Sequence, residues 1–441
     1  MLVAEKDTNF SKNPVVTAAQ TDNFPPCAGG ERGGALIADV QTMKALARKC
    51  IVRQIRLRFY DVDIILESDS GKFVDHFTRL YRRFCEEGPP SLTEEGRGVG
   101  RFPDSAMARS TFEFILLSNP DNPWGGQVMI CNDEVWPLYD QRLLEGYAYE
   151  MVLSAIITKI RSHLLLHAGV VSCNGQGVII VADSMHGKTT LVVELVRRGF
   201  RFLSDEMAAL GRHDHAVHPF PRSLWIRKGT LELAGLRDKA VNALQWMGKT
   251  ILDIEEIIPD SLGTAVPAGH IIMLKNPDEK KGSEQEGAGQ EVCMMIDRFD
   301  EEFLAEVQRG EGITHVRESV HEGYPALRFR AARPNVALSR AELLCRQHRI
   351  LVLDVIKGER EYPTFNARAV HQEIPASQAI TDILSRYQGG YLSDVLHDEF
   401  QGNAVRLFLE LSTLVSRAKC HRISVGPLNE VADLVCKAVN A

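Results

Sequence analysis

The fold of this chain is decided by the stretch Leu164-Leu-Leu-His-Ala-Gly-Val-Val-Ser-Cys-Asn-Gly-Gln-Gly-Val-Ile-Ile-Val-Ala-Asp-Ser-Met-His-Gly-Lys-Thr-Thr190. Two apolar runs, 164–171 and 178–181, flank the dipeptide Asn174-Gly175. Asn-Gly favours a tight turn, because both residues tolerate positive φ. The stretch therefore predicts a β-hairpin whose second strand leads directly into a candidate phosphate-binding loop.

A helix is expected directly after this loop, from Lys188 to Arg198. Leu191 and Leu195 lie four residues apart and would share one face of that helix. Gly199 suits the position just after a helix end. A strand, a tight loop and a helix form a phosphate cradle, because the first N–H groups of the helix and its dipole favour negative charge.

The loop comes close to the standard pattern Gly-x-x-x-x-Gly-Lys-Ser/Thr. Ala182 stands at the first glycine; alanine is small but restricts positive φ. Gly187-Lys188-Thr189 is intact, so Lys188 would bind the β- and γ-phosphates of ATP, and the Thr189 hydroxyl would bind Mg²⁺. The expected nucleotide-binding residues are Ala182, Asp183, Ser184, Met185, His186, Gly187, Lys188, Thr189 and Thr190.

Two carboxylates follow the next predicted strand, Phe200-Arg-Phe-Leu203. Ligands of open α/β sheets bind outside the carboxyl ends of the strands, so Asp205 and Glu206 are expected near the γ-phosphate. One carboxylate can hold Mg²⁺, and the other can accept a proton from an attacking hydroxyl. His167 lies in the first apolar run, where a lone histidine is usually a core residue. If the two hairpin strands pair, it lies beside the phosphate-loop strand, within reach of an active-site carboxylate.

Composition narrows the class of protein. The 441 residues are 44% hydrophobic and 25% charged, as in an ordinary globular protein, and the net charge of −7 argues against nucleic-acid binding. No apolar stretch approaches the ~20 residues that span a bilayer, so no membrane partner is expected. Nine scattered cysteines without a Cys-x-x-Cys pair, and an amino terminus without signal-peptide features, favour a cytoplasmic location.

Three parts are expected along the chain. Residues 1–48 lack a sustained period and predict a flexible tail. Residues 49–150 mix alternating apolar runs with a helical pattern and predict a small α+β domain. Residues 151–441 would form an ATP-binding α/β domain, in which the polar, glycine-containing segment 276–291 is expected to be a disordered insertion.

The segments 166–190 and 195–206 together resemble the HPr kinase/phosphorylase superfamily, and in particular HPr-kinase-related proteins rather than typical HPr kinases. The resemblance implies a P-loop kinase domain of the HPr kinase/phosphoenolpyruvate carboxykinase type with a smaller amino-terminal α+β domain. It implies that Lys188 binds phosphate, that Thr189 and Asp205 bind the metal ion, and that Glu206 stands at the position of the catalytic base. His167 matches a family histidine. Family kinases often form homo-oligomers, so self-association is a further expectation.

Several functions remain open at this point. The first is an ATP-dependent kinase acting on a hydroxyl of a protein, peptide or small molecule, with Arg222 and Arg227 as candidates for contacting phosphate or acceptor. The second is a nucleotide-binding regulator or scaffold, because Ala182 and Met185 replace family glycines and Glu206 is longer than the usual aspartate. A carboxykinase-like lyase lacks identifiable metal ligands, and a GTPase lacks the Asn-Lys-x-Asp signature.

Overall fold

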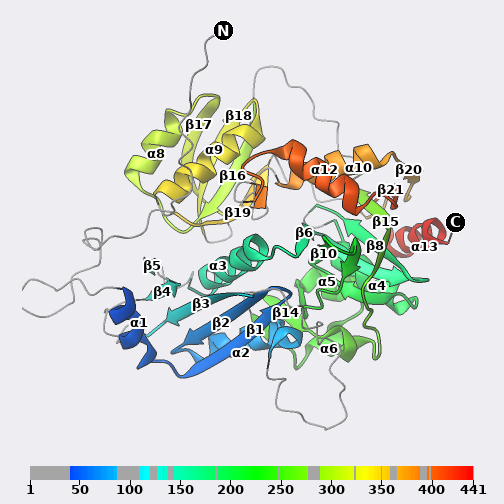
Figure 1. The fold of residues 1–441 in the computed structure, drawn as a ribbon. Helices are drawn as coiled ribbons and strands as arrows, with labels where there is room; N and C mark the ends of the chain where they lie inside the picture. The colour runs from blue at the N-terminus through cyan, green and yellow to red at the C-terminus, as the bar shows by residue number, and fades with distance from the viewer. Residues whose placement is uncertain are drawn as a thin grey trace, which may run out of the picture.

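A computed structural model of the chain describes residues 40–86, 109–119, 127–132, 134–137, 144–183, 186–246, 248–276, 289–321, 324–348, 350–357, 365–387, 395–396 and 399–440. These residues form sheets of five, nine, three and four strands, accompanied by helices (Figure 1). The expected α/β class is therefore confirmed. Within these ranges, no helix is both long enough and apolar enough to cross a bilayer.

The amino-terminal sheet has the order β1-β2-β3-β4-β5. Its strands are β1 (Arg53–Phe59), β2 (Val62–Ser68), β3 (Ser110–Leu117), β4 (Val128–Cys131) and β5 (Glu134–Pro137). Helix α2 (Gly71–Leu80) and the short η2 (Arg82–Phe84) cover one face, and α1 (Val40–Arg48) packs on the other through Met43 and Ala47. The flexible tail expected through residue 48 is thus wrong for residues 40–48, because their apolar side chains are buried against the sheet. Residues 1–39 lie outside the described residues.

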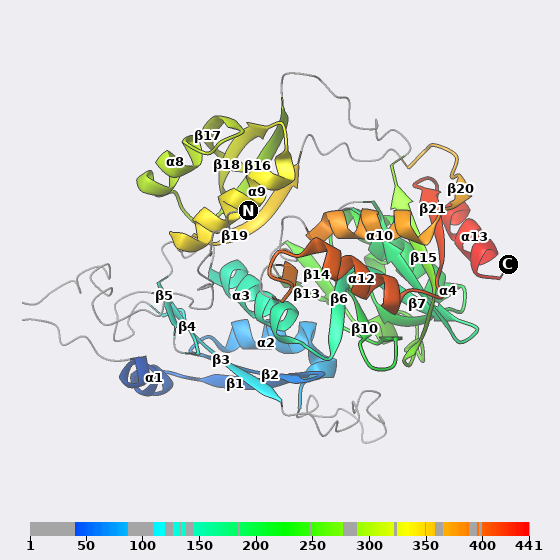
Figure 2. The ribbon, with the colours of Figure 1, turned by 45° about the horizontal axis from the view of Figure 1, so that its top comes forward.

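Helix α3 (Leu144–Lys159) is buried around most of its circumference. It packs on β2 and β3 on one side and on β19 (Val352–Lys357) on the other, so it lies between two sheets (Figure 2). A helix that is apolar all round is stable only in such an enclosed position. The domain boundary expected at residue 150 therefore falls inside an element that joins two parts of the molecule.

The nine-stranded sheet carries the predicted hairpin. Seven strands follow the order β6-β10-β11-β15-β8-β7-β9, and β21 and β20 extend the sheet from β15. They are β6 (His163–His167), β7 (Gly169–Cys173), β8 (Gln176–Val181), β9 (Arg201–Ser204), β10 (Met207–Gly211), β11 (Ala216–His218), β15 (Val266–Lys275), β20 (His371–Glu373) and β21 (Lys419–Ser424). Asn174 and Gly175 have φ of 51° and 72°, which confirms the turn predicted between β7 and β8.

Two helices cover each face of this sheet. Helix α4 (Lys188–Arg197), which follows the candidate phosphate loop, and α13 (Leu428–Val439) share one core with Val171 of β7 and with Val178 and Ile180 of β8. Helices α10 (Ala376–Leu384) and α12 (Ala404–Leu414) pack on the opposite face, in a core that continues into the amino-terminal sheet. The 3-10 turn η4 (Ser385–Tyr387) follows α10.

The first apolar run, 164–171, is not one hairpin strand as expected. It divides at Ala168 into β6, which pairs with β10, and β7, which pairs with β8. The Ala168 N–H donates to the carbonyl of Glu206 at 3.0 Å, where the chain passes from one partner strand to the other. His167 therefore lies opposite Met207 of β10, and not beside the phosphate-loop strand.

A separate four-stranded sheet occupies residues 290–357, with the order β17-β18-β16-β19. Its remaining elements are β16 (Gln290–Ile296), β17 (Ile313–His321), β18 (Tyr324–Ala331), α8 (Glu301–Gln308) and α9 (Pro334–Gln347). The two helices bury one face of the sheet around Phe303 and Phe329. Of the disordered insertion expected at 276–291, Gln290 and Glu291 lie in β16, Asn276 is buried, and 277–288 lie outside the described residues.

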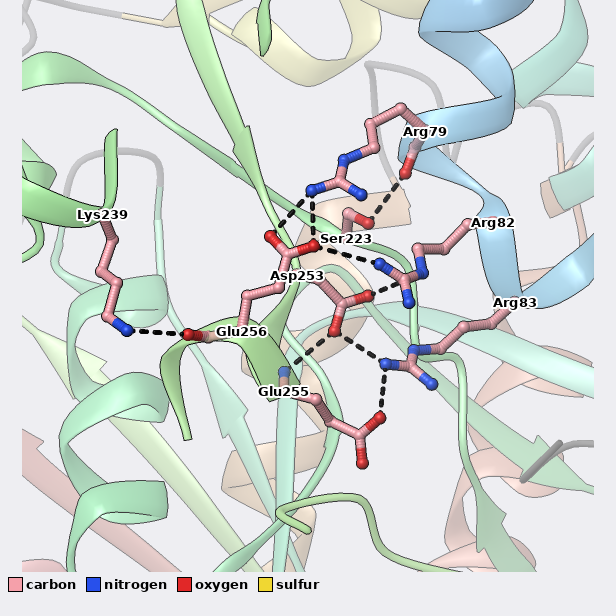
Figure 3. A network of polar contacts seen from close by, with 8 residues as sticks. All are labelled: Arg79, Arg82, Arg83, Ser223, Lys239, Asp253, Glu255 and Glu256. Atoms are coloured by element: carbon pink, nitrogen blue, oxygen red, sulfur yellow. Dashed lines mark hydrogen bonds and ion pairs between the residues drawn. The ribbon is translucent and has the colours of Figure 1, made fainter. Parts of the chain in front are cut away.

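A small third sheet connects the amino-terminal part to the part that contains the nine-stranded sheet. It contains β12 (Leu224–Ile226), β13 (Leu244–Trp246) and β14 (Lys249–Leu252), with the short helices α5 (Lys228–Leu233), α6 (Arg237–Ala240) and α7 (Ile254–Ile257). A network of ion pairs joins it to the end of α2 and to η2 (Figure 3). Its charged members are Arg79, Arg82 and Arg83 on one side and Asp253, Glu255 and Glu256 on the other.

The centre of this network is buried. Asp253 is 1% exposed, caps α7 by accepting from the Glu255 N–H at 2.9 Å, and meets Arg83 Nη2 at 2.7 Å. Next to the network, the backbone N–H and hydroxyl of Ser223 donate to the carbonyls of Leu80 and Arg79 at 2.8 and 2.9 Å. The amino-terminal part is thereby fixed against the segment that precedes β12.

Gly169 of β7 allows α4 to approach the sheet closely, so Gly169→Ala should destabilise the protein. A Cβ at this position would lie 2.6 Å from Val192 Cγ2 and 3.3 Å from Lys188 Cγ. Overpacking of this kind costs about 1–3 kcal/mol, which denaturant unfolding would measure. The control is Gly229→Ala in α5, where a Cβ meets nothing within 4 Å and where alanine favours the helix. Equal stability changes in the two variants would contradict the close-approach argument.

Candidate functional site

The candidate site lies where several chain segments meet around the start of α4. Strand β8 leads into the loop before α4, β6 ends at His167, and β9 ends at Ser204, directly before Asp205 and Glu206. The Ser204 hydroxyl accepts from the Glu206 N–H at 3.1 Å and from the Met207 N–H at 3.0 Å, which turns the chain sharply after β9. This turn brings both carboxylates to the end of the sheet that carries the loop.

The loop needs a glycine at one end but not at the other. Gly187 has a φ of 82° and precedes the first residue of α4, a left-handed conformation that favours glycine. Ala182 is fully buried and has no positive φ, so alanine fits there without strain. Between them, the His186 N–H donates to the Asp183 carbonyl at 3.2 Å. Ser184 and Met185 lie outside the described residues.

Lys188, the first residue of α4, contacts His167. The two nitrogens, Lys188 Nζ and His167 Nε2, are 2.7 Å apart. Burial, together with the charge of Lys188, lowers the pKa of His167 to about 3, so the imidazole is neutral and accepts from the ammonium at Nε2. Burial also lowers the pKa of Lys188 to about 8, although Glu206 and Asp205 oppose that shift. Lys188 thus remains a cation at neutral pH.

Glu206 is held between His167 and Arg222. Its Oε1 lies 3.4 Å from His167 Nδ1, and its Oε2 accepts from Arg222 Nη2 at 2.8 Å. Arg222 is 3% exposed and donates from Nη1 to the hydroxyl of Tyr149 in α3 at 3.0 Å. Burial would raise the pKa of Glu206, but Arg222, His167 and Lys188 outweigh it and lower the pKa to about 2. The carboxylate therefore stays ionised.

Asp205 faces the hydroxyl of Thr189. Thr189 Oγ1 donates to Asp205 Oδ2 at 3.5 Å, and Asp205 Oδ1 is buried without a hydrogen-bond partner among the described residues. Asp205 is 2% exposed, and this burial raises its pKa to about 6 despite the opposing charge of Arg222. A buried carboxylate oxygen beside a hydroxyl is a donor pair that suits a hard cation such as Mg²⁺.

This pair is not a complete metal site. In the ranges that the structure covers, no three His, Cys, Asp or Glu side chains converge on a common point. Mg²⁺ commonly binds through one or two protein oxygens and takes its other ligands from water and nucleotide phosphates. Thr189 and Asp205 therefore fit a metal that arrives together with a nucleotide.

Most residues expected from the sequence do come together. Lys188, His167 and Glu206 form one connected group, although His167 reaches it from β6 and not from the hairpin. Thr189 and Asp205 form a separate pair beside this group. Of the two candidate arginines, Arg222 contacts Glu206, whereas Arg227 precedes α5.

Sequence reasoning missed two residues at this site. Tyr149 is one of many apolar or aromatic residues in α3, and its hydroxyl accepts from Arg222. Arg386 of η4 pairs with Asp183 of the loop at 2.5 Å across a separation of 203 residues. No local pattern around Arg386 signals that contact, because it depends on how α10 packs.

Comparisons with known proteins agree with the sequence motifs. No family model matches the chain. The chain is 31% identical over 96 residues to an HPr kinase/phosphorylase of Mycoplasmopsis pulmonis, and 28% identical over 120 residues to an HPr kinase/phosphorylase of Limosilactobacillus reuteri. These matches cover 20% and 27% of this chain, and only 30% and 37% of the relatives' own lengths.

Among solved structures, the chain matches the HPr(Ser) kinase/phosphatase from Coxiella burnetii. The match is 16% identical, covers 42% of this chain and 95% of that chain, and has a TM-score of 0.20. That score is too low to support a conclusion about shared geometry. The predicted resemblance of this chain to the HPr kinase/phosphorylase superfamily is confirmed by the two relatives found by sequence.

Proposed function

We propose that this chain is an ATP-dependent phosphotransferase that moves the γ-phosphoryl group of ATP to a hydroxyl of a protein, peptide or small molecule. The observation that carries the proposal is the connected group Lys188–His167–Glu206, with the Thr189–Asp205 pair beside it, at the start of one helix. A phosphate-binding cation, a metal-binding pair and a carboxylate within reach of an acceptor are the parts that phosphoryl transfer requires. The names of the relatives support the same class of reaction.

The exposed fractions of Asp205 and Glu206 suggest a different role for each carboxylate. Glu206 keeps 21% of its side-chain surface exposed, whereas Asp205 is 2% exposed. Only Glu206 is open to an incoming hydroxyl, so Glu206 would orient that hydroxyl and accept its proton. Asp205 and Thr189 would hold Mg²⁺, which, when bound, neutralises charge on the phosphate oxygens. Lys188 and the N–H groups at the start of α4 would bind the phosphates.

Glu206 is a weak base because Arg222 and His167 stabilise its charge. This does not exclude transfer, since catalysis of phosphoryl transfer depends largely on positioning and electrostatic stabilisation, and a weakly basic carboxylate can still orient the acceptor hydroxyl. The Glu206–Arg222 ion pair is nevertheless the observation that favours the second candidate, a nucleotide-binding regulator without turnover. The two candidates predict the same nucleotide binding and differ only in phosphoryl transfer.

We propose a cytoplasmic setting, supported by the thiols. The eight cysteines within the described residues are thiols and not disulfides, as is usual in a reducing compartment. We also propose self-association, which rests on the family resemblance. A role of the amino-terminal part in selecting the acceptor is a proposal that rests on chain order.

Lys188→Ala should abolish nucleotide binding, and Glu206→Gln should preserve binding while reducing phosphoryl transfer. Lys188 supplies the phosphate-binding cation, whereas Glu206 acts on the acceptor; loss of a general base typically costs roughly 100-fold or more in rate. Calorimetry with ADP measures binding, and transfer of radiolabelled γ-phosphate to candidate acceptors measures turnover. Lys437→Ala, an exposed lysine of α13, is the control. A wild-type protein that binds ATP but phosphorylates no acceptor would favour the regulator.

The Mg²⁺ dependence of nucleotide binding should weaken in acid because of Asp205. The raised pKa of about 6 means that the carboxyl takes up a proton as pH falls from about 7 to about 5, and Mg²⁺ must then displace that proton. The apparent Mg²⁺ affinity should therefore fall by up to roughly tenfold per pH unit below about 6. Titrations of Mg²⁺ with ADP at several pH values measure this effect. Asp205→Asn should remove the part of the pH dependence that exceeds titration of the nucleotide itself; an unchanged slope in this variant would exclude Asp205 as a ligand.

A further inference from the structure

The phosphate loop is held by an arginine that the loop motif does not contain. Arg386 Nη1 lies 2.5 Å from Asp183 Oδ1, and Asp183 is the second residue of the loop. The Arg386 side chain is 14% exposed, and its Nε is buried without a partner among the described residues. The Asp183 side chain, by contrast, is 43% exposed. One partner of this ion pair is therefore largely enclosed by the protein, whereas the other borders solvent.

The neighbouring residue anchors Arg386 in place. The hydroxyl of Tyr387 donates to the carbonyl of Leu165 in β6 at 2.5 Å, and Tyr387 is 1% exposed. Leu165 lies two residues before His167, which contacts Lys188. The preceding helix α10 is buried through Ala379, Ile380 and Ile383. The backbone that carries Arg386 is thus fixed without any contribution from Asp183, and the charge of Arg386 acts on Lys188.

Positive charge exceeds negative charge around Asp183. Burial would raise the pKa of Asp183, but Arg386, Lys275 and His186 outweigh it and lower the pKa below its ordinary value. Lys357, at the end of β19 in the four-stranded sheet, also interacts electrostatically with Asp183 and Arg386. The charge of Arg386 also lowers the pKa of Lys188 and the pKa of His167. Three cations from separate segments, Arg386, Lys275 and Lys357, therefore act on one carboxylate, an arrangement suited to a group with several negative charges.

We propose that Arg386 contacts the γ-phosphoryl group of bound ATP, and that the Asp183 carboxylate occupies the guanidinium until the nucleotide arrives. This inference rests on the proposed function. Guanidinium groups bind phosphate oxygens through parallel hydrogen bonds, and a phosphate carries more charge than the carboxylate it replaces. Asp183 and a γ-phosphate would repel each other, so the exposed carboxylate turns away while the anchored arginine stays.

Arg386 would then stabilise charge during transfer without forming a bond itself. The bond between the γ-phosphorus and the oxygen bridging it to the β-phosphate breaks, and its electron pair stays on ADP. The acceptor oxygen forms the new bond to phosphorus, and its proton goes to Glu206. Arg386 faces the oxygens of the transferred group, where charge lies in the transition state.

Nucleotide binding tests this inference without a known acceptor. Calorimetry would compare ADP with the non-hydrolysable analogue AMP-PNP, which carries a γ-phosphate. Arg386→Ala should weaken AMP-PNP binding by roughly 10- to 100-fold while leaving ADP binding nearly unchanged, the range for loss of a charged hydrogen bond. Arg386→Lys should recover part of that loss. Asp183→Asn should strengthen AMP-PNP binding several-fold relative to ADP binding, because it removes the competing carboxylate.

Two controls separate this role from a structural one. Arg422→Ala removes another partly buried arginine, which pairs with Asp382 of α10 at 3.5 Å, and should leave the ratio of the two affinities unchanged. Thermal unfolding of each variant checks that the fold persists. If Arg386→Ala and Asp183→Asn weakened both nucleotides equally, the pair would be a structural clamp and the inference would be overturned. A wild-type protein that bound neither nucleotide would instead overturn the proposed function itself.

Discussion

The site depends on how one lysine ammonium is accommodated at the start of a helix. Burial destabilises the charge of Lys188, so the group requires partners that face it directly. His167 provides a neutral acceptor at 2.7 Å, and Glu206 and Asp205 provide opposite charge. These partners come from the ends of β6 and β9, and neither strand carries the loop. The convergence of strand ends around Lys188 is therefore an electrostatic requirement as well as a feature of sheet topology.

The amino-terminal part takes part in the same electrostatics. Arg222 balances Glu206, and its second nitrogen is held by Tyr149 of α3. The backbone next to Arg222 is fixed through Ser223 to the end of α2, beside the ion pairs around Asp253 (Figure 3). Exposed ion pairs contribute little to stability, but Asp253 is buried and hydrogen-bonded, so breaking its contacts would leave an uncompensated charge. The basicity of Glu206 thus depends partly on residues of the amino-terminal part, such as Tyr149, which hold Arg222 in place.

Local chemistry was predictable from the sequence, and non-local packing was not. The Asn174-Gly175 turn, the helix after Gly187 and the carboxylates after β9 follow from residue types at short spacing. The run 164–171 was wrongly expected to be one strand, because a continuous apolar run does not reveal a change of pairing partner at Ala168. The four-stranded sheet at 290–357 and the contact of Arg386 with Asp183 depend on packing between distant segments. Such contacts have no signature in a short window of sequence.

The departures from the standard loop pattern carry less weight than the sequence suggests. Glycine is required where a residue adopts positive φ or where another backbone approaches closely. Gly187 meets the first condition, whereas Ala182 is buried directly after the end of β8 and has no positive φ. A loop with fewer glycines is stiffer, and here Asp183 is further restrained by Arg386. Under the proposed function, the activity of this site would therefore depend less on glycine content than on whether an incoming phosphate displaces Asp183 from its arginine.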